Sequence, residues 1–444
     1  MYNCDAMRIS VNNFGPIREA NIRISPLTLF VGPSNTGKSY LATLLYAAIA
    51  PSNLHTVAVH YQKTKPINAD LVKKCFMRWA EFMGNEWQKN IVHCLGEAGE
   101  DILKSQNMSV ELSSSDDDMT PDDGDITIDL RNPKNSRIGN GIINSIIDNL
   151  EKRGLPKSGL ERSIGLSMFT EIEFMHKLGR YGRIYYLPAV RGGIMKSYRI
   201  VADRAILNAA KASTSPMFSG IYGNCARQLI SIKKTETDVE DALTINKVLE
   251  DKVLDGRINV TFSDTESPEF RYEMNDPKGK KGDMAINNVS DAVAGNAVLS
   301  VFMRYHLRSI TGGSNFWILE EPEINLHPEK QRNIADILVR LANAGVGVLA
   351  TTHSDIILGQ IGNSYRASQF KDADKGRKLL GEDHEPLDKS KELAVYSFVE
   401  SSKGTKVEKM DFEHITGVMP EDHLDAARSL YNKTVRLVNG KNNE

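Results

Sequence analysis

The stretch TLFVGPSNTGKSYLATLLYAA, residues 28–48, decides how this chain folds. It contains GPSNTGKS, which matches the phosphate-binding loop (P-loop) pattern G-x-x-x-x-G-K-[ST], with Gly32, Gly37, Lys38 and Ser39 at the required positions. An apolar run precedes the loop, and an apolar helical run follows it. Because a P-loop joins a buried strand to the N-terminus of a helix, this context predicts an α/β nucleotide-binding domain.

The residues of this loop have separate tasks. The glycines let the backbone fold so that its N–H groups and the helix N-terminus surround phosphates. We expect Lys38 to reach the β- and γ-phosphates of ATP and Ser39 to hold Mg²⁺. The nucleotide contacts predicted for the loop are Gly32, Pro33, Ser34, Asn35, Thr36, Gly37, Lys38, Ser39 and Tyr40.

A second motif is NFWILEEPEINLHPE, residues 315–329. Its apolar residues 316–319 predict a buried strand that delivers Glu320 and Glu321 to its carboxyl end, where α/β sheets bind ligands. Adjacent strand residues point to opposite faces. We therefore expect Glu320 to hold the Mg²⁺ shell and Glu321 to be the base that polarises the attacking water.

A third motif is VLATTHSD, residues 348–355. It predicts a buried strand that ends at His353, which follows the carboxylate strand along the chain. We expect His353 to donate a hydrogen bond to the γ-phosphate or to the attacking water. The predicted catalytic residues are therefore Glu321, His353 and Lys38.

Strands alternate with helices along the rest of the chain, which favours an α/β fold. The segments 7–17 and 20–31 predict two antiparallel N-terminal strands with a turn at Gly15-Pro16. The predicted fold class is α/β, a P-loop ATPase with a mixed sheet and a large, mostly helical insertion. The predicted divisions are residues 1–50 for the N-terminal part of the ATPase core, 51–182 for the insertion, and 183–444 for the C-terminal part with a helical subdomain.

Further elements follow from the same patterns. Residues 183–190 predict a strand that returns to the core, and the segment from 290 predicts a helix. Strand pairs are expected at 256–275, at 108–130 with an acidic tip (Asp116–Asp125), and near 393–412, with a final helix near 423–437.

Composition and charge restrict the class of protein. The formal net charge is −2 with a pI of about 6.6, which gives no global attraction to nucleic acid or anionic membrane. The four cysteines form no C-x-x-C pair, which argues against a zinc site or a disulfide framework. The N-terminus lacks a signal-peptide pattern, and the longest apolar run, 40–50, is about half a membrane span. We expect a cytoplasmic protein without membrane contact.

Together these motifs resemble the ABC-class ATPases. The resemblance is closest to the SMC/RecF-like branch, which includes the overcoming-lysogenization-defect (OLD) ATPases and the stand-alone ATPase subunit of Septu-type antiphage systems. It rests on NFGPI (13–17), FVGPSNTGKSYLA (30–42), YLPAVRGGI (186–194), ILEEPEINLHPE (318–329) and TTHSD (351–355), and it leaves the insertion uncovered.

The resemblance implies roles for individual residues. Glu321 corresponds to the catalytic glutamate, Glu320 to the metal-side acid, and His353 to the switch histidine. Asn325 and His327 fall in the loop that meets the dimer partner.

Two further nucleotide contacts are implied by the resemblance. Arg191 stands where the branch often has an arginine that does the work of the Q-loop. Ser290 stands where the LSGGQ-type signature caps the γ-phosphate of the opposite subunit's ATP. The equivalent segment here, NNVSDAVAGNAVLS (287–300), lacks the Gly-Gly pair.

The sequence leaves three functional hypotheses open. The first is the ATPase subunit of a bacterial antiphage complex, a homo-oligomer that senses phage DNA or protein and controls a separate nuclease or toxin, with no nuclease domain of its own. The second is an ATP-dependent DNA-binding repair protein of the RecF/SMC kind. The third, a transporter's nucleotide-binding subunit, would normally have an intact LSGGQ signature.

Overall fold

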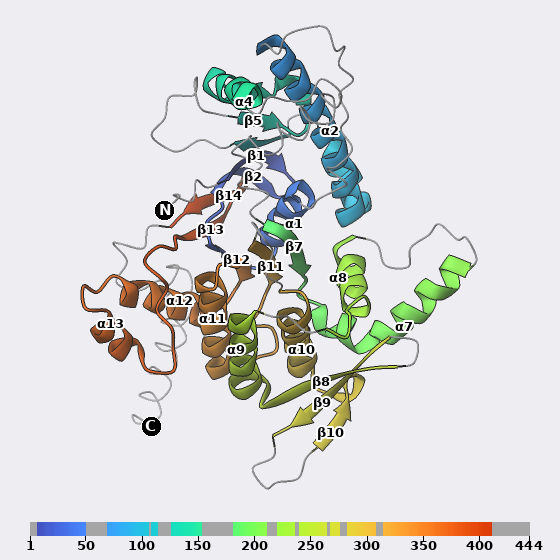
Figure 1. Ribbon diagram of the computed structural model, residues 1–444, viewed down its shortest axis with the longest axis vertical. Coiled ribbons are helices and arrows are strands. Elements are labelled where there is room, and N and C mark those ends of the chain that lie inside the picture. The colour runs from blue at the N-terminus through green and yellow to red at the C-terminus, as the bar shows by residue number, and fades with distance from the viewer. Residues whose placement is uncertain are drawn as a thin grey trace, which may run out of the picture.

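The computed structural model describes residues 7–49, 69–105, 108–113, 126–152, 181–210, 220–235, 239–263, 267–275, 282–307 and 314–410. Within these ranges the chain forms an eleven-stranded mixed sheet with helices on both faces (Figure 1). In spatial order the strands are β6 (Arg137–Ile138), β5 (Ile126–Asp129), β4 (Ser109–Ser113), β1 (Arg8–Phe14), β2 (Ile17–Arg23), β14 (Gly404–Lys409), β13 (Leu393–Ser401), β3 (Leu27–Val31), β12 (Gly347–Thr352), β11 (Ser314–Glu320) and β7 (Tyr181–Leu187).

The five strands from β13 to β7 are parallel, and their side chains feed two separate hydrophobic cores. In β3, Leu29 faces one core and Phe30 the other. Since both faces are covered, β3 and β12 are buried at every residue, as parallel strands usually are. The α/β fold class predicted from the sequence is confirmed.

The helices divide between the two faces. One core packs against α1 (Lys38–Ile49), α2 (Ala69–Leu95), α3 (Glu97–Lys104) and α4 (Asn140–Lys152). The other packs against α7 (Arg191–Ala210), α8 (Gly220–Ile230), α9 (Glu240–Leu249), α10 (Asp291–Tyr305), α11 (Pro328–Asn343) and α12 (Asp355–Ser368), with α13 (Ala373–Leu380) packed on α12.

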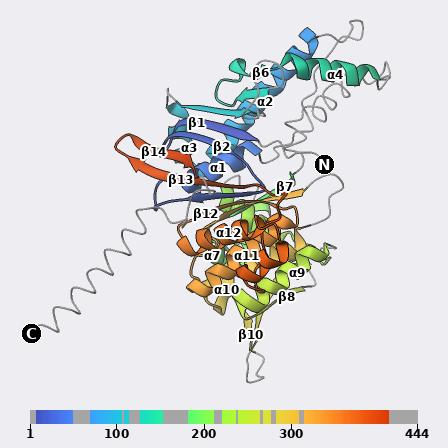
Figure 2. The same ribbon diagram turned by 90° about the vertical axis from the view of Figure 1, so that its left-hand side faces the viewer.

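A second, three-stranded antiparallel sheet contains β8 (Gly256–Phe262), β9 (Pro268–Met274) and β10 (Gly282–Ala285). A π-helical turn, Glu250–Leu254, leads into it from α9. Figures 1 and 2 show this small sheet at one end of the long axis, with α4 and β4–β6 at the other end. None of the described helices combines the length and the hydropathy needed to cross a bilayer.

The N-terminal strands differ from the prediction in one respect. A single strand over 20–31 is wrong, because β2 ends at Arg23 and β3 begins only at Leu27. Pro26 separates them, and proline has no N–H for a sheet ladder. The interruption lets the chain move from a position between β1 and β14 to one between β13 and β12.

The described part of 51–182 contains helices α2–α4 and also strands β4–β6. Strand β4 pairs antiparallel with β1, with Val110 opposite Val11, so this part of the chain extends the main sheet. The hairpin of β4 and β5 is confirmed, whereas its acidic tip and the helix expected near 423–437 lie outside the described residues.

Candidate nucleotide site

The P-loop connects β3 to α1, and two of its positions require glycine. Gly32 has φ +135°, and a Cβ atom there would lie 2.7 Å from the carbonyl oxygen of Phe398. Gly37 has φ +96°, and its Cβ would lie 2.8 Å from Cγ of Pro16. These backbone conformations strain other L-residues, so the loop owes its shape to both glycines.

Lys38 lies at the first turn of α1 and is 4% exposed. Its Nζ donates to the carbonyl oxygens of Gly32 at 2.9 Å and Pro33 at 2.5 Å. It also contacts Nδ1 of His353 at 3.4 Å. Burial lowers the pKa of Lys38 to about 8, and this outweighs the opposing attraction of Glu321.

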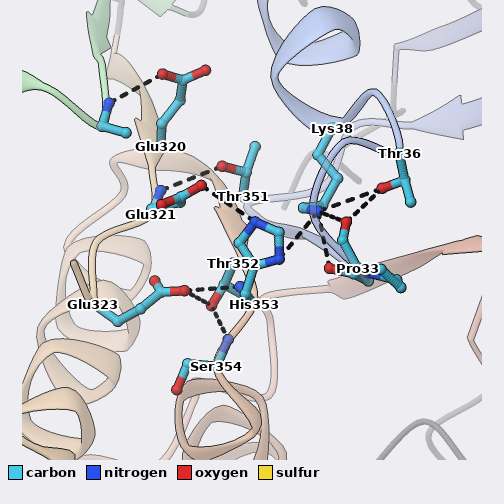
Figure 3. A network of polar contacts seen from close by, with 12 residues as sticks. Pro33, Thr36, Lys38, Glu320, Glu321, Glu323, Thr351, Thr352, His353 and Ser354 are labelled. Atoms are coloured by element: carbon cyan, nitrogen blue, oxygen red, sulfur yellow. Dashed lines mark hydrogen bonds and ion pairs between the residues drawn. The ribbon is translucent and has the colours of Figure 1, made fainter. Parts of the chain in front are cut away.

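His353 joins the P-loop to the end of β11. Its Nε2 lies 3.2 Å from Oε1 of Glu321, while its Nδ1 faces Lys38 (Figure 3). Because an ammonium group only donates, Nδ1 accepts, and the proton of a neutral ring then sits on Nε2 and is donated to Glu321. This hydrogen bond is the main cause that lowers the pKa of Glu321. Lys38, His353 and Glu321 therefore form a continuous polar chain.

The backbone of Glu321 has an unusual conformation for a non-glycine residue, with φ +41°. Its N–H donates to the carbonyl oxygen of Thr351 at 2.9 Å. Its own carbonyl oxygen, like that of Pro322, accepts from Nη2 of Arg191 at 3.3 Å. Such a conformation persists where surrounding contacts over-determine it, which is common at functional sites.

Arg191 begins α7 and lies beneath the site with its side chain fully buried. Its Nη1 donates to the carbonyl oxygens of Glu320 at 2.7 Å and Pro188 at 3.3 Å. Burial lowers the pKa of Arg191 below its ordinary value. With the bonds to the next two residues of the turn, these contacts hold the carboxyl end of β11 in place. The predicted contact of Arg191 with nucleotide stays a prediction.

Glu320 is buried and points away from Lys38, toward β7 (Figure 3). Its Oε1 accepts from the hydroxyl of Tyr186 at 2.6 Å, and its Oε2 accepts from the N–H of Ala189 at 3.1 Å. The Tyr186 hydroxyl also contacts Oγ1 of Thr43 at 3.1 Å. Thr43 lies one turn after Ser39 on α1, so Tyr186 connects the carboxylate of Glu320 to the P-loop helix.

Three more predicted residues lie at or near the surface. Ser39 is exposed at the start of α1, and Tyr40 is half-buried with its ring edge against Phe14. Ser290 is exposed and caps α10, accepting from the N–H of Val293 at 3.3 Å.

The loop between β11 and α11 carries two more predicted residues. Asn325 and His327 are both exposed there, and His327 is the residue that precedes the first turn of α11. Asn325 has φ +61°, a left-handed conformation that asparagine tolerates better than most residues.

Two residues that sequence reasoning did not select support the site. Tyr186 holds Glu320, and burial, the largest cause, raises its pKa well above the ordinary value, so its hydroxyl stays a donor. Glu323 accepts hydrogen bonds at the end of β12. Glu323 could have been selected from the sequence because it is the third glutamate of EEPE. Tyr186 could not, because its sequence context is that of any residue in a buried strand.

The residues present fit ATP and Mg²⁺. The P-loop offers a glycine-shaped backbone and a lysine, and Pro33, Ser34 and Asn35 are exposed. Ser39 and Glu320 offer the oxygen donors that Mg²⁺ prefers. Each carboxylate oxygen of Glu320 accepts a hydrogen bond and retains a lone pair for a cation.

A P-loop after a parallel strand, with a histidine and a carboxylate at the ends of the next two strands of the sheet, defines the protein as a P-loop ATPase. The family model described as "AAA ATPase domain" matches residues 7–163 and 188–358. The chain therefore belongs to this AAA ATPase domain family. No curated protein matches it significantly.

Solved structures similar to this chain include three SMC head domains. One is the SMC head bound to the C-winged helix domain of ScpA, at 10% identity and TM-score 0.38, covering 92% of this chain and 98% of that one. Another, from Thermotoga maritima, has 10% identity and TM-score 0.35, with coverage of 91% and 99%. The third, with an extended coiled coil and bound to the C-terminal domain of ScpA derived from Pyrococcus furiosus, has 9% identity and TM-score 0.36, with coverage of 97% and 99%.

Proposed function

We propose that the chain binds and hydrolyses ATP as a subunit of a bacterial antiphage defence complex, in which it controls a separate nuclease or toxin. The observation that supports the hydrolysis is the polar chain from Lys38 through His353 to Glu321. These side chains come from the carboxyl ends of neighbouring parallel strands, which is where α/β sheets act on ligands.

The chemistry assigned to these residues is a water attack on the γ-phosphate. Glu321 takes a proton from the water while the water oxygen bonds to the γ-phosphorus. The bond between the γ-phosphorus and the β–γ bridging oxygen breaks, and ADP leaves. The lowered pKa of Glu321 keeps it ionised near neutral pH and thus able to accept this proton. Lys38 neutralises phosphate charge. His353 orients the Glu321 carboxylate by a hydrogen bond and keeps it next to the γ-phosphate.

A metal completes this assignment. Ser39 and Glu320 would hold Mg²⁺, which supplies neutralisation of the charge on the phosphates. The Tyr186 hydroxyl and the Ala189 N–H orient the Glu320 carboxylate for that role.

The proposal includes a dimer that sandwiches ATP, as in the ABC class that the motifs resemble. Ser290 at the N-terminus of α10, and Asn325 and His327 beyond β11, are exposed and thus accessible to a second copy. Ser290 is already engaged as an N-cap, and its segment lacks the Gly-Gly pair. We therefore expect a weaker dimer than an intact signature would give.

The defence role rests on the motif resemblance, which also includes DNA-repair clamps of the RecF/SMC kind. A clamp arm calls for a long coiled coil. In the described part of 51–182, α2 has 27 residues and packs on the core, while β4–β6 pair with the sheet. This arrangement favours a docking surface for a partner over an arm that encircles DNA.

The experiment is expression of the tagged protein with its genomic neighbours, followed by purification and mass measurement of the complex. A stoichiometric nuclease or toxin-like partner would support the defence role. A homo-oligomer that retains only DNA would instead support the repair clamp. Glu321→Gln with ATP tests the sandwich separately, because a protein that stays monomeric under these conditions would contradict it.

A further inference from the structure

Glu323 lies in the turn after β11, outside the set of residues to which the motifs assign chemistry. Its Oε1 accepts two hydrogen bonds from the end of β12, one from the Thr352 hydroxyl at 2.6 Å and one from the backbone N–H of His353 at 2.8 Å (Figure 3). A carboxylate acceptor makes such bonds shorter and stronger than a neutral one. The Glu323 side chain, from the turn after β11, thus holds the backbone of His353 by hydrogen bonds.

The turn after β12, which carries His353, is also held by hydrogen bonds of Ser354. The Thr352 hydroxyl accepts from the N–H of Ser354 at 2.9 Å. The Ser354 hydroxyl donates to Oε1 of Gln331 at 2.6 Å and accepts from the N–H of Ile357 at 3.2 Å, which caps α12. The backbone around His353 is therefore anchored on both sides, and Glu323 is the anchor that reaches it directly.

The position of the His353 ring depends on this backbone. Its two nitrogens lie 3.4 Å from Nζ of Lys38 and 3.2 Å from Oε1 of Glu321, so a shift of about 1 Å would break one contact or both. Displacements of this size at a reacting centre can lower rates on the order of 100-fold. Accurate placement of the ring is therefore expected to matter for turnover.

We propose that Glu323 is a positioning residue for ATP hydrolysis, acting by holding the His353 backbone so that its ring spans Lys38 and Glu321. This inference rests on the proposed ATPase function of the site. It also explains the third glutamate of EEPE, whose carboxylate is directed at the Thr352 hydroxyl and the His353 N–H.

The test is steady-state ATP hydrolysis by the full chain carrying Glu323→Ala or Glu323→Gln. Alanine removes the acceptor of both bonds, and we expect kcat to fall on the order of 10- to 100-fold with little change in KM. Glutamine keeps an acceptor oxygen, and we expect it to restore kcat to within about threefold of wild type. Glu400→Ala, which removes an exposed glutamate of β13, is the matched control and should leave kcat unchanged.

A double-mutant cycle with His353→Ala separates positioning from general support. If Glu323 acts through His353, Glu323→Ala should slow the His353→Ala enzyme little or not at all. An equal slowing in both backgrounds, or a rise in KM with kcat unchanged, would overturn the proposal. If the wild type hydrolyses no ATP, the proposed function itself fails, so the two failures are distinguishable.

Thr352→Val provides a second route should Glu323→Ala not fold. It removes the hydroxyl that bonds Glu323, which is also the acceptor of the Ser354 N–H, and leaves the bond from the His353 N–H. We expect a smaller fall in kcat that also disappears in the His353→Ala background. Persistence of the fall in that background would contradict the proposal in the same way.

Discussion

The main sheet has a parallel half, from β13 to β7, and a largely antiparallel half, from β6 to β14. The two halves differ in burial and in where their strands end. In the parallel half, β3 and β12 are buried at every residue, and the P-loop, Glu321 and His353 follow directly from the ends of three neighbouring strands. In the antiparallel half, β1 and β4 largely alternate between buried and less buried positions. Parallel strands bring their carboxyl ends to one edge, whereas antiparallel neighbours send successive ends to opposite edges.

This difference indicates where in the sheet functional residues can gather. Polar residues that are distant in sequence gather at the edge of the parallel half, such as Lys38 and His353, which are 315 residues apart. The antiparallel half offers partly exposed surface and pairs with β4 from the 51–182 segment. We expect substitutions in the first half to change chemistry, and those in the second to change stability.

The largest effect is expected from Lys38→Ala. It removes the charged group predicted to contact the β- and γ-phosphates, and we expect ATP binding and hydrolysis to fall below detection. Calorimetric titration with ATP and a phosphate-release assay measure the two losses. Lys406→Ala, at an exposed position of β14, is the control and should behave as wild type. Normal ATP affinity in Lys38→Ala would mean that the P-loop is not the binding site.

Glu321→Gln should separate binding from turnover. The amide keeps the shape of the side chain but cannot take a proton, so kcat should fall by about 10²- to 10⁴-fold while ATP still binds. Single-turnover kinetics and equilibrium binding measure the two properties on one sample. Wild-type turnover in this variant would show that another group is the base.

Ile128→Ala tests the antiparallel half. Ile128 is fully buried in β5, and its truncation should lower the free energy of unfolding by about 2–5 kcal/mol. Because β5 lies far from the site along the sheet order, kcat at a temperature where the variant is folded should stay unchanged. Urea unfolding and ATPase assays on the same preparation provide the comparison. A fall in kcat alongside the loss of stability would show that packing in the antiparallel half affects catalysis.

The smallest effect is a pH dependence of ATP binding. The pKa of Lys38 is lowered to about 8, so above this pH the free protein increasingly carries a neutral amine. Phosphate favours the ammonium form, so binding should take up a proton near pH 9 and almost none at pH 6.5. The affinity should be ~10-fold weaker at pH 9 than at pH 7, since a group with this pKa is about one-tenth protonated at pH 9.

Calorimetry in buffers of different ionisation enthalpy measures the proton uptake. Release of a proton on binding, or no pH dependence between 7 and 9, would contradict a lowered pKa for Lys38.

Much of the site was predictable because its motifs are local. The strand before Gly32, the helix from Lys38, and the strand ending at Glu320 all lie where the apolar runs predict them. A buried parallel strand needs little more than a short apolar run, and a P-loop needs glycines at fixed spacing. The class of protein follows from these short-range requirements.

Other features depended on partners that are distant in sequence. The break between β2 and β3 falls at Pro26, but the strands that flank each of them come from distant segments of the chain. Helices α12 and α13 lack a motif and went unassigned. The support that Glu320 receives from Tyr186 joins residues 134 apart, so no local pattern could announce it.

The sequence by itself determined that this chain is a P-loop ATPase with two carboxylates and a histidine at strand ends, because each motif is a few residues whose chemistry depends on local spacing. Only the tertiary structure decided which way those groups face. It turned Glu320 toward β7 and Glu321 toward His353, buried Arg191 under the turn, and brought Glu323 to the His353 backbone. Side-chain direction at a strand end is set by packing against neighbouring strands and helices, which a linear pattern does not contain.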